Sequence, residues 1–480
     1  MRNVSHLFAC TCLLASSTVA LSAASQQEAD SVKAALEKLL TSTPGVVSVI
    51  PKGDSYDLTI DPAPLLAKAK SADATVTISP HHFTVTPLGN GKWQFKIDEP
   101  ASYGFKLAGG QSFDVNLGKV TYEGEFDETL GALTKSGFQV IDYQSLQNTS
   151  DPSGTKTFAK GNIAEFKGNS VAVANPGGGV DVTSNYTSRN WKVDNEVSGP
   201  GQPGLAFTYE IGSSDYDSTG NGVRQKEILG LLAWFVARPS VDLITQDQES
   251  LRTTLRSVLP YAERIAVQGR ANSIAVATPF GNATLDSVGL VLDMHGLVKN
   301  GKLREQISFA GLSLPPGVTP PWSAGLVPTG ATIDFTLTGF DPAAAANHVI
   351  DKFDLTKSPS LSAADQAALP SLWLPTGILN LKFEPNQIKS GLYEINMDGD
   401  FKISMVGMPT GKANIRMKGF DATMQALQAA AASDPSAQQA MGPLLAAKGF
   451  ARIEGDEFVW SVETTAIGGI LVNGIDVTKM

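Results

Sequence analysis

Histidine and cysteine are the residues whose chemistry is most versatile, because they supply nucleophiles, general bases and transition-metal ligands. The chain of 480 residues has five histidines and two cysteines. His81 and His82 are adjacent, and on a strand they would point to opposite faces, so they could not chelate one ion together. Cys10 and Cys12 both lie in an apolar segment near the start of the chain. We therefore expect no metal, no cofactor and no disulfide.

Carboxylates are more numerous, but few are spaced for a known reaction. The run from Asp215 to Gly222 resembles a calcium loop at its first, third and sixth positions, yet Lys226 stands at the twelfth, where a bidentate Glu is required. A polar loop ahead of a helix is the better interpretation. The chain contains no nucleophile elbow, P-loop, dinucleotide fingerprint or His-Glu-x-x-His sequence. These patterns predict that the protein is not an enzyme.

The most apolar internal segment runs from Ile228 to Ala237 and would be apolar on every side of a helix. It is too short to span a membrane. Three interpretations stay open: a core helix, which we favour, the wall of a lipid-like cavity, or a contact with a membrane surface. If it is a wall, the residues that line an apolar ligand are Leu229, Leu232, Trp234 and Phe235.

A short motif in which Gly, Phe and Asp end an alternating strand recurs along the chain. Its copies end at Asp127, Asp341 and Asp421, and the first copy carries an extra Glu. Gly permits the turn, Phe returns to the core, and Asp is a preferred N-cap for a following helix. We predict that all three Asp residues are structural helix caps and not catalytic groups. The recurrence suggests repeated strand-strand-helix units, although chance recurrence remains an alternative.

The elements that must position these residues are mostly strands, because period-two alternation dominates the chain. One example is Trp93, Phe95 and Ile97, which follow a Gly89-Asn90-Gly91 turn and predict a β-hairpin. The sequence predicts an α+β fold of mostly antiparallel, curved β-sheet, with amphipathic helices packed on one face. The predicted helices are about 30–40, 225–238 and 247–259, and residues 342–350 and 424–445 offer further apolar, alanine-rich helix faces.

The first 24 residues have the features of a secretory signal peptide: Arg2, an apolar run from Leu7 to Leu21, and small residues before Ser25. We predict cleavage near Ala24, export to the periplasm, and no membrane span in the mature chain. The net charge is −10, and Lys and Arg are not clustered, which opposes nucleic-acid binding.

The remaining chain is polar and glycine-rich between about Tyr143 and Gly222, and its most linker-like piece is Ser198–Gly204. We therefore predict a β-rich N-terminal domain over 25–200, a linker over 201–224, and an α+β domain over 225–480 that carries the Gly-Phe-Asp units.

The second half of the chain resembles uncharacterised exported proteins of alphaproteobacteria, grouped as domain of unknown function family 2125, and more distantly AsmA-type and YdgA-type envelope proteins. The resemblance rests on Phe309–Gly317, Phe335–Asp341 with the strand and helix unit through Leu427, and Leu471–Asp476. It implies an envelope location and long sheets with tucked helices, and its AsmA-like branch implies a hydrophobic groove associated with lipids.

The functional hypothesis from the sequence is a non-enzymatic, exported cell-envelope protein that binds an apolar ligand or lipid in a sheet concavity. The alternative is a periplasmic scaffold or adaptor that binds other envelope proteins through sheet edges.

Overall fold

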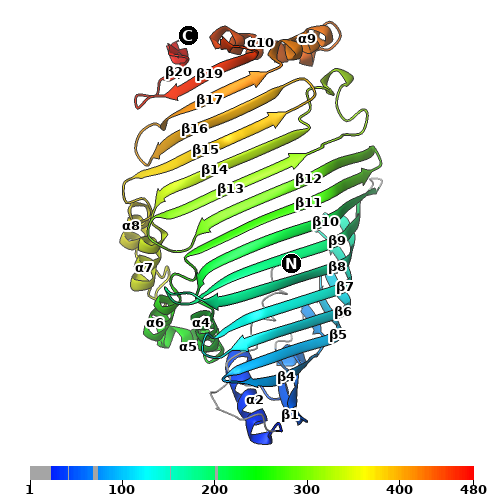
Figure 1. The fold of residues 1–480 in the computed structure, drawn as a ribbon, viewed down its shortest axis with the longest axis vertical. Helices are drawn as coiled ribbons and strands as arrows, with labels where there is room; N and C mark the ends of the chain where they lie inside the picture. Colours follow the sequence, from blue (N-terminus) through cyan, green and yellow to red (C-terminus); the bar gives the residue numbers. More distant parts are fainter. Residues whose placement is uncertain (1–22, 42, 69–73, 152, 201–203, 480) are drawn as a thin grey trace. The chain divides into compact units, whose positions relative to one another are not determined.

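A computed structural model of the chain describes residues 23–41, 43–68, 74–151, 153–200 and 204–479 (Figure 1). The predicted signal peptide lies outside the described residues except for Ala23 and Ala24. Two compact units are distinguished. Unit 1 runs to Ile265 and also includes Asn347–Asp365, and unit 2 comprises Ala266–Ala346 and Gln366 onward. The chain therefore enters unit 2, returns to unit 1 for one helical segment, and leaves again.

Unit 1 is built on one antiparallel sheet whose strands lengthen along the sequence. Its neighbours follow the order β1–β2–β4–β5–β6–β7–β8–β9–β10, and β3 pairs with the second half of β5. The strands are β1 (Val47–Lys52), β2 (Ser55–Ile60), β3 (Ala74–Ile78), β4 (His81–Gly89), β5 (Lys92–Leu107), β6 (Ser112–Asp127), β7 (Ala132–Ser150), β8 (Lys156–Ala174), β9 (Val180–Ser198) and β10 (Leu205–Val223).

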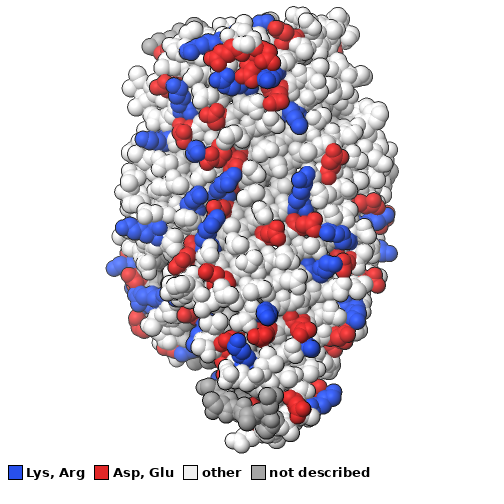
Figure 2. Space-filling view, in the orientation of Figure 1, with Lys and Arg blue, Asp and Glu red and all other residues white. Residues whose placement is uncertain are grey.

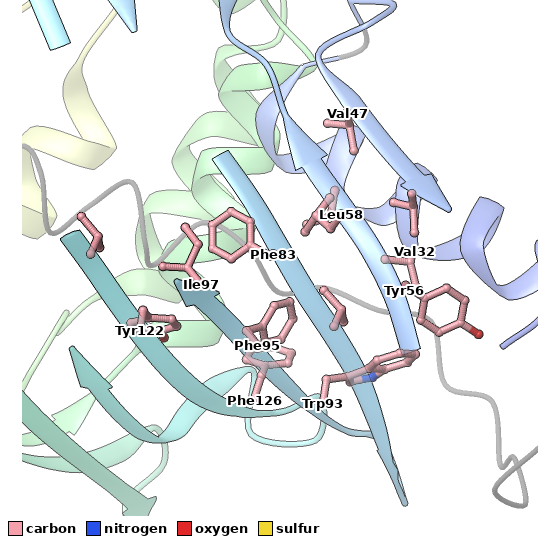
Figure 3. Packing of buried hydrophobic residues seen from close by; sticks show 14 of the residues in the cluster. Val32, Val47, Tyr56, Leu58, Phe83, Trp93, Phe95, Ile97, Tyr122 and Phe126 are labelled. Atoms are coloured by element: carbon pink, nitrogen blue, oxygen red, sulfur yellow. The ribbon is translucent and has the colours of Figure 1, made fainter. Parts of the chain in front are cut away.

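The helices of unit 1 are α2 (Gln26–Leu40), α3 (Ala63–Lys68), α4 (Gln225–Val236), α5 (Val241–Gln246) and α6 (Gln248–Val258), together with most of α7 (Pro342–Lys352). The main core lies between α2 and the strands β1 to β6, where Val32, Tyr56, Leu58, Phe95 and Phe126 pack together (Figure 3). Burial of so many large apolar side chains is the main stabilising contribution to this end of the sheet.

Two local predictions are confirmed here. The helix predicted over 30–40 is α2, and Val32, Leu36 and Leu39 are buried on one side of it. The predicted hairpin joins β4 to β5, and its turn residues Asn90 and Gly91 have φ of 52° and 69°. Ser25, the residue expected to follow the cleavage site, is the N-cap of α2 and accepts a hydrogen bond from Glu28 N at 3.2 Å. Among the described residues, the first helix therefore begins directly after the predicted cleavage site.

Unit 2 contains the antiparallel strands β11 to β21, with two helices packed on its C-terminal strands. Its pairings follow β12–β13–β14–β15–β16–β17–β19–β20–β21, with β18 beside β19. The elements are β11 (Arg264–Thr278), β12 (Gly281–His295), β13 (Gly301–Ala310), η1 (Pro321–Ser323), β14 (Gly330–Phe340), α8 (Ala363–Trp373), β15 (Ile378–Lys389), β16 (Glu394–Ser404), β17 (Thr410–Lys418), α9 (Phe420–Ala431), α10 (Pro435–Phe450), β18 (Arg452–Glu454), β19 (Glu457–Thr464), β20 (Ile470–Val472), β21 (Ile475–Asp476) and η2 (Val477–Lys479).

The coarse fold class is thus confirmed as a β-rich α+β fold of mostly antiparallel sheet. The predicted division into two domains and a linker is not confirmed. The linker predicted over 201–224 is mostly β10, which pairs with β9 along its length, and only residues 201–203 of it lie outside the described residues. The prediction failed because this strand exposes one side and carries small residues such as Ser214 and Gly220 on a sheet, where composition alone suggests a loop. The calcium-like run from Asp215 to Gly222 is likewise strand and not loop.

Candidate functional site

The apolar helix predicted from the sequence is α4, and only one of its sides is closed. Trp234 is 8% exposed and packs with Leu251 of α6 and Phe353, which follows α7. Its indole Nε1 donates to Ser250 Oγ at 2.9 Å, and the Arg238 guanidinium lies 4.2 Å above the ring. A tryptophan whose polar atom is satisfied and whose ring is covered is a core residue. Trp234 is therefore packed inside the cluster that α4 forms with α6 and Phe353.

The four predicted wall residues do not share one environment. Leu229 is buried like Trp234, whereas Leu232 and Phe235 are 39% and 40% exposed. Leu229 and Leu232 are three residues apart and are therefore neighbours on the helix surface, yet one is buried and the other is exposed. The helix is therefore not covered on all sides. The sequence prediction of a wall made from all four residues therefore does not match the geometry of α4.

A larger apolar surface, missed at the sequence level, follows strands β7 to β10. One rung of the sheet places Phe138, Gly168, Tyr186 and Tyr216 side by side on these four strands. Only glycine fits at position 168 without a shift of these rings, because a Cβ there would lie 2.4 Å from Tyr186 Cδ1 and 2.8 Å from Phe138 Cε1. The two flanking rings lean over the space that glycine leaves, with ring centroids 6.1 Å apart.

The neighbouring rungs extend this surface. Phe166 packs on Phe138 with centroids 5.0 Å apart, and Trp191 meets Tyr209 edge-on at 5.6 Å. We call this surface the aromatic face and define it by its members: Phe138, Tyr143, Ile163, Phe166, Tyr186, Trp191, Tyr209, Ile211 and Tyr216. Phe138 and Tyr143 pack against the main core, whereas Phe166 and Tyr216 are 37% and 39% exposed. The face therefore begins in the core and continues into a part of the sheet that solvent reaches.

A change of phase halfway along the strands brings these residues to one side. On β8 the buried positions are Gly161 and Ile163 before the change and Gly168 and Ala172 after it. The register places Ala164 between Asp142 of β7 and Asn190 of β9, whose φ angles are 55° and 54°. A residue in this conformation re-aims the side chains that follow, so alternation resumes one residue out of phase. The apolar spacing of three from Ile163 to Phe166 is the sequence feature that could have revealed it.

The opposite side of the same strands carries ion pairs. Arg189 meets Asp215 at 2.9 Å, Lys167 meets Glu165 at 3.1 Å, and Lys192 meets Glu210 at 3.3 Å. Each pair is at least partly exposed and contributes little to stability, but it keeps that side of the sheet wet. These strands are thus apolar and aromatic on one side and charged on the other, as in a sheet whose two sides meet different surroundings.

The three predicted helix caps have three different outcomes. Asp341 Oδ1 accepts a hydrogen bond from Ala344 N at 2.9 Å at the start of α7, which is the geometry of an N-cap. Asp127 accepts from Thr129 N and Leu130 N, but the segment is a turn that leads into β7 and not into a helix. Asp421 lies inside the first turn of α9, whose N-cap is Gly419, and it pairs with Lys448 at 2.7 Å. Helix capping by Asp127 and Asp421 was therefore a wrong prediction, because the same three letters meet different backbone geometries.

The histidines predicted to diverge do so. His81 is buried beside Tyr103, with Nε2 3.2 Å from the Tyr103 hydroxyl and Nδ1 3.7 Å from Glu99 Oε1, whereas His82 is exposed. Burial lowers the pKa of His81, and Glu99 opposes this effect. Among the described residues there is no cluster of three or more His, Cys, Asp or Glu side chains that could hold a metal ion.

A buried carboxylate, Asp334, lies inside the sheet of unit 2. Asp334 accepts from Arg304 Nε at 3.0 Å, from Arg304 Nη2 at 2.7 Å and from Gln306 Nε2 at 2.8 Å, and Asn386 bonds its backbone. Hydrogen bonding from Arg304 holds the pKa of Asp334 below its ordinary value. A carboxylate whose two oxygens are already occupied by donors is suited to fixing strand register and not to removing a proton from a substrate.

The surface charges do not gather into a patch of one sign on the view in Figure 2, where Lys and Arg are interspersed with Asp and Glu. Within the described ranges, no helix has both the length and the apolar character needed to cross a bilayer.

Comparison with known proteins gives one match. No curated protein and no solved structure matches the chain. Residues 235–457, which include the end of α4, α5 to α10 and most of the strands of unit 2, match the family DUF2125, described as an uncharacterized protein conserved in bacteria.

Proposed function

We propose that this is an exported, non-enzymatic protein of the bacterial cell envelope that binds an apolar, lipid-like ligand on the aromatic face of unit 1. The observation that carries the proposal is the incomplete cover of that face. Aromatic side chains in a closed core lose nearly all contact with water, whereas Phe166 and Tyr216 retain more than a third of their exposure.

The geometry suits a long apolar chain better than a compact polar ligand. The rungs from Phe138 to Tyr216 cross four strands, and the residues on either side of the phase change extend the surface along them. The polar groups on this side are mainly hydroxyls, and Ser188 and Ser214 bond to each other at 2.5 Å. The named members of the face include no charged side chain, so contact area would supply most of the affinity.

Predicted export supports the same proposal. The signal-peptide features of residues 1–24 favour a location outside the cytoplasm, and the distant resemblance of the second half of the chain to AsmA-type proteins implies an association with lipids. A hydrocarbon chain in a periplasm must be shielded from water during transfer, and an open aromatic face on a long sheet can do this.

Native mass spectrometry of the protein purified without detergent tests the proposal directly. We expect a bound species whose mass is that of a fatty acid or phospholipid, lost on mild activation. A ligand-free spectrum, together with no saturable uptake of the fluorescent fatty acid cis-parinaric acid, would contradict it.

A further inference from the structure

Two loops of unit 2 carry the two most exposed large apolar side chains among the described residues. Val406, between β16 and β17, is 86% exposed, and Ile467, between β19 and β20, is 95% exposed. Met405 and Met408 in the first loop are 49% and 58% exposed. We call these four residues the apolar tip. Single exposed apolar residues are common on proteins, but four on two turns require an explanation.

The strand pairing brings the two loops together. Gly411 of β17 faces Phe401 of β16 on one side and Thr464 of β19 on the other, and Thr464 also faces Ile470 of β20. Both loops therefore leave the sheet at the same rung. A Cβ added at Gly468 would lie 3.4 Å from Met408 Cε, so the loops are in van der Waals reach of each other.

Local hydrogen bonds hold both loops in shape. Val406 N donates to Ser404 Oγ at 3.2 Å, and Met405 N donates to Gly377 O at 2.9 Å. In the second loop Thr465 N donates to Gly469 O, and Gly468 N to Thr465 O, both at 2.9 Å. The apolar side chains are thus presented by defined turns, which lowers the entropy lost when they are buried by a partner.

The size and composition of the tip indicate which partner fits. A stable protein interface takes about 800 Å² and roughly 20–30 residues from each partner, far more than four side chains on two turns. Lipid needs no such complementary surface, because acyl chains flow around whatever is inserted. The loops 405–409 and 465–469 contain no charged residue, so insertion would bury no ion.

We propose that the apolar tip is a membrane-contact site that dips into the headgroup and upper acyl region of a lipid bilayer. The apolar tip shares no residue with the aromatic face of unit 1, and this proposal does not depend on ligand binding at that face. The first rungs behind the tip carry Lys402 and Lys412 together with Asp400 and Glu463, which are of both signs. Binding should therefore depend on insertion and be nearly independent of anionic lipid.

Co-sedimentation with lipid vesicles tests this site. The protein is used as it is purified from the expressing cell, with no further truncation. The tip variant is Val406→Asp with Ile467→Asp. The matched control is Phe280→Asp with Ile453→Asp, which adds the same charge at positions 75% and 69% exposed. Both control residues lie at the edge of the sheet opposite the apolar tip. Ile453 is in β18, which pairs with the start of β19, whereas Ile467 of the tip follows the end of β19. The strand register places Phe280, in the turn before β12, at the same edge as Ile453.

We expect the tip variant to bind phosphatidylcholine vesicles at least about tenfold more weakly, as for the loss of inserted apolar side chains, and the control to bind as the unaltered protein does. Adding phosphatidylglycerol should change little. Equal loss in both variants, or unchanged binding by the tip variant, would overturn the proposal.

A local reporter distinguishes the tip from the apolar N-terminal segment, which could itself bind lipid. Ile467→Cys in a chain with Cys10 and Cys12 replaced by Ser gives one labelling site for an environment-sensitive fluorophore. Vesicles should shift its emission to the blue, and an unshifted spectrum would contradict insertion. The other partner to test is a second copy of this chain, and sedimentation equilibrium without lipid measures it. If the unaltered protein is a dimer and the tip variant is a monomer, the tip is a self-association site and the membrane proposal is wrong.

Discussion

The α4–α6 cluster and the aromatic face of β7–β10 are both rich in large apolar residues, but they are covered to different extents. In the cluster, Trp234 is enclosed by Leu251 and Phe353 and its indole N–H is paired. On the face, Phe166 packs on Phe138, yet Phe166 and Tyr216 remain more than a third exposed. The difference shows that an apolar run in the sequence does not reveal how far the rest of the fold covers it. The proposed ligand site rests on that incomplete cover.

The largest expected effect tests the closed side of this comparison. Trp234→Ala removes a covered indole, so we expect a loss of about 3–5 kcal/mol in the free energy of unfolding, measured by urea denaturation. Leu232→Ala, two residues away on the exposed side of α4, should cost less than about 1 kcal/mol. Similar losses for the two variants would show that α4 is covered on both sides.

The next effect separates two copies of one sequence motif. Asp341→Ala removes the acceptor for Ala344 N and should cost about 0.5–2 kcal/mol, as for other N-caps. Asp421→Ala removes only a surface pair with Lys448 and should cost less than about 0.5 kcal/mol. Thermal unfolding of both variants measures the difference, and a larger effect at Asp421 would restore it as a structural cap.

Much of the closed part of the molecule could be predicted from the sequence. Strict alternation at Trp93, Phe95 and Ile97, and periodic apolar residues in α2, report directly on which side chains are buried. The open part could not be predicted in the same way. Its strands alternate out of phase on either side of Asp142 and Asn190, and their inward positions include Gly168, Ser188 and Ser214, so no period-two run is long enough to stand out.

The structural outcome of the three Gly-Phe-Asp copies was harder still to predict from the sequence. Gly339 and Gly419 both adopt positive φ, at 93° and 75°, and both precede a helix, whereas the Gly124 copy lies inside β6. Residue identity sets the permitted turn, but the neighbouring strands decide whether a helix can follow. The repeated unit itself therefore stays a prediction.

A smaller effect concerns pH, at the edge of the closed core. Burial lowers the pKa of His81, so the unfolded chain takes up a proton near pH 6.5 that the folded chain resists. Stability should be fully present above that pH and decline as the pH falls below it. Melting temperatures between about pH 7.5 and pH 5.5 should fall less in His81→Gln than in the unaltered protein.

His82→Gln is the control for this titration, because the neighbouring imidazole is exposed and its Nδ1 lies 3.0 Å from Thr59 Oγ1 on the surface. It should behave as the unaltered protein does. If His82→Gln flattens the pH profile as much as His81→Gln, burial of His81 is not the cause.

The central claim, that the aromatic face binds an apolar ligand, is tested most directly by two matched phenylalanines on β8. Phe166 lies on the aromatic face, and Phe158 lies on the charged side next to Glu196, with exposures of 37% and 38%. The measurement is the dissociation constant for cis-parinaric acid by fluorescence titration of Phe166→Ala and Phe158→Ala. We predict about tenfold weaker binding for Phe166→Ala, as for removal of a large apolar contact, and unchanged binding for Phe158→Ala. Equal affinities in the two variants would contradict a ligand site on the aromatic face.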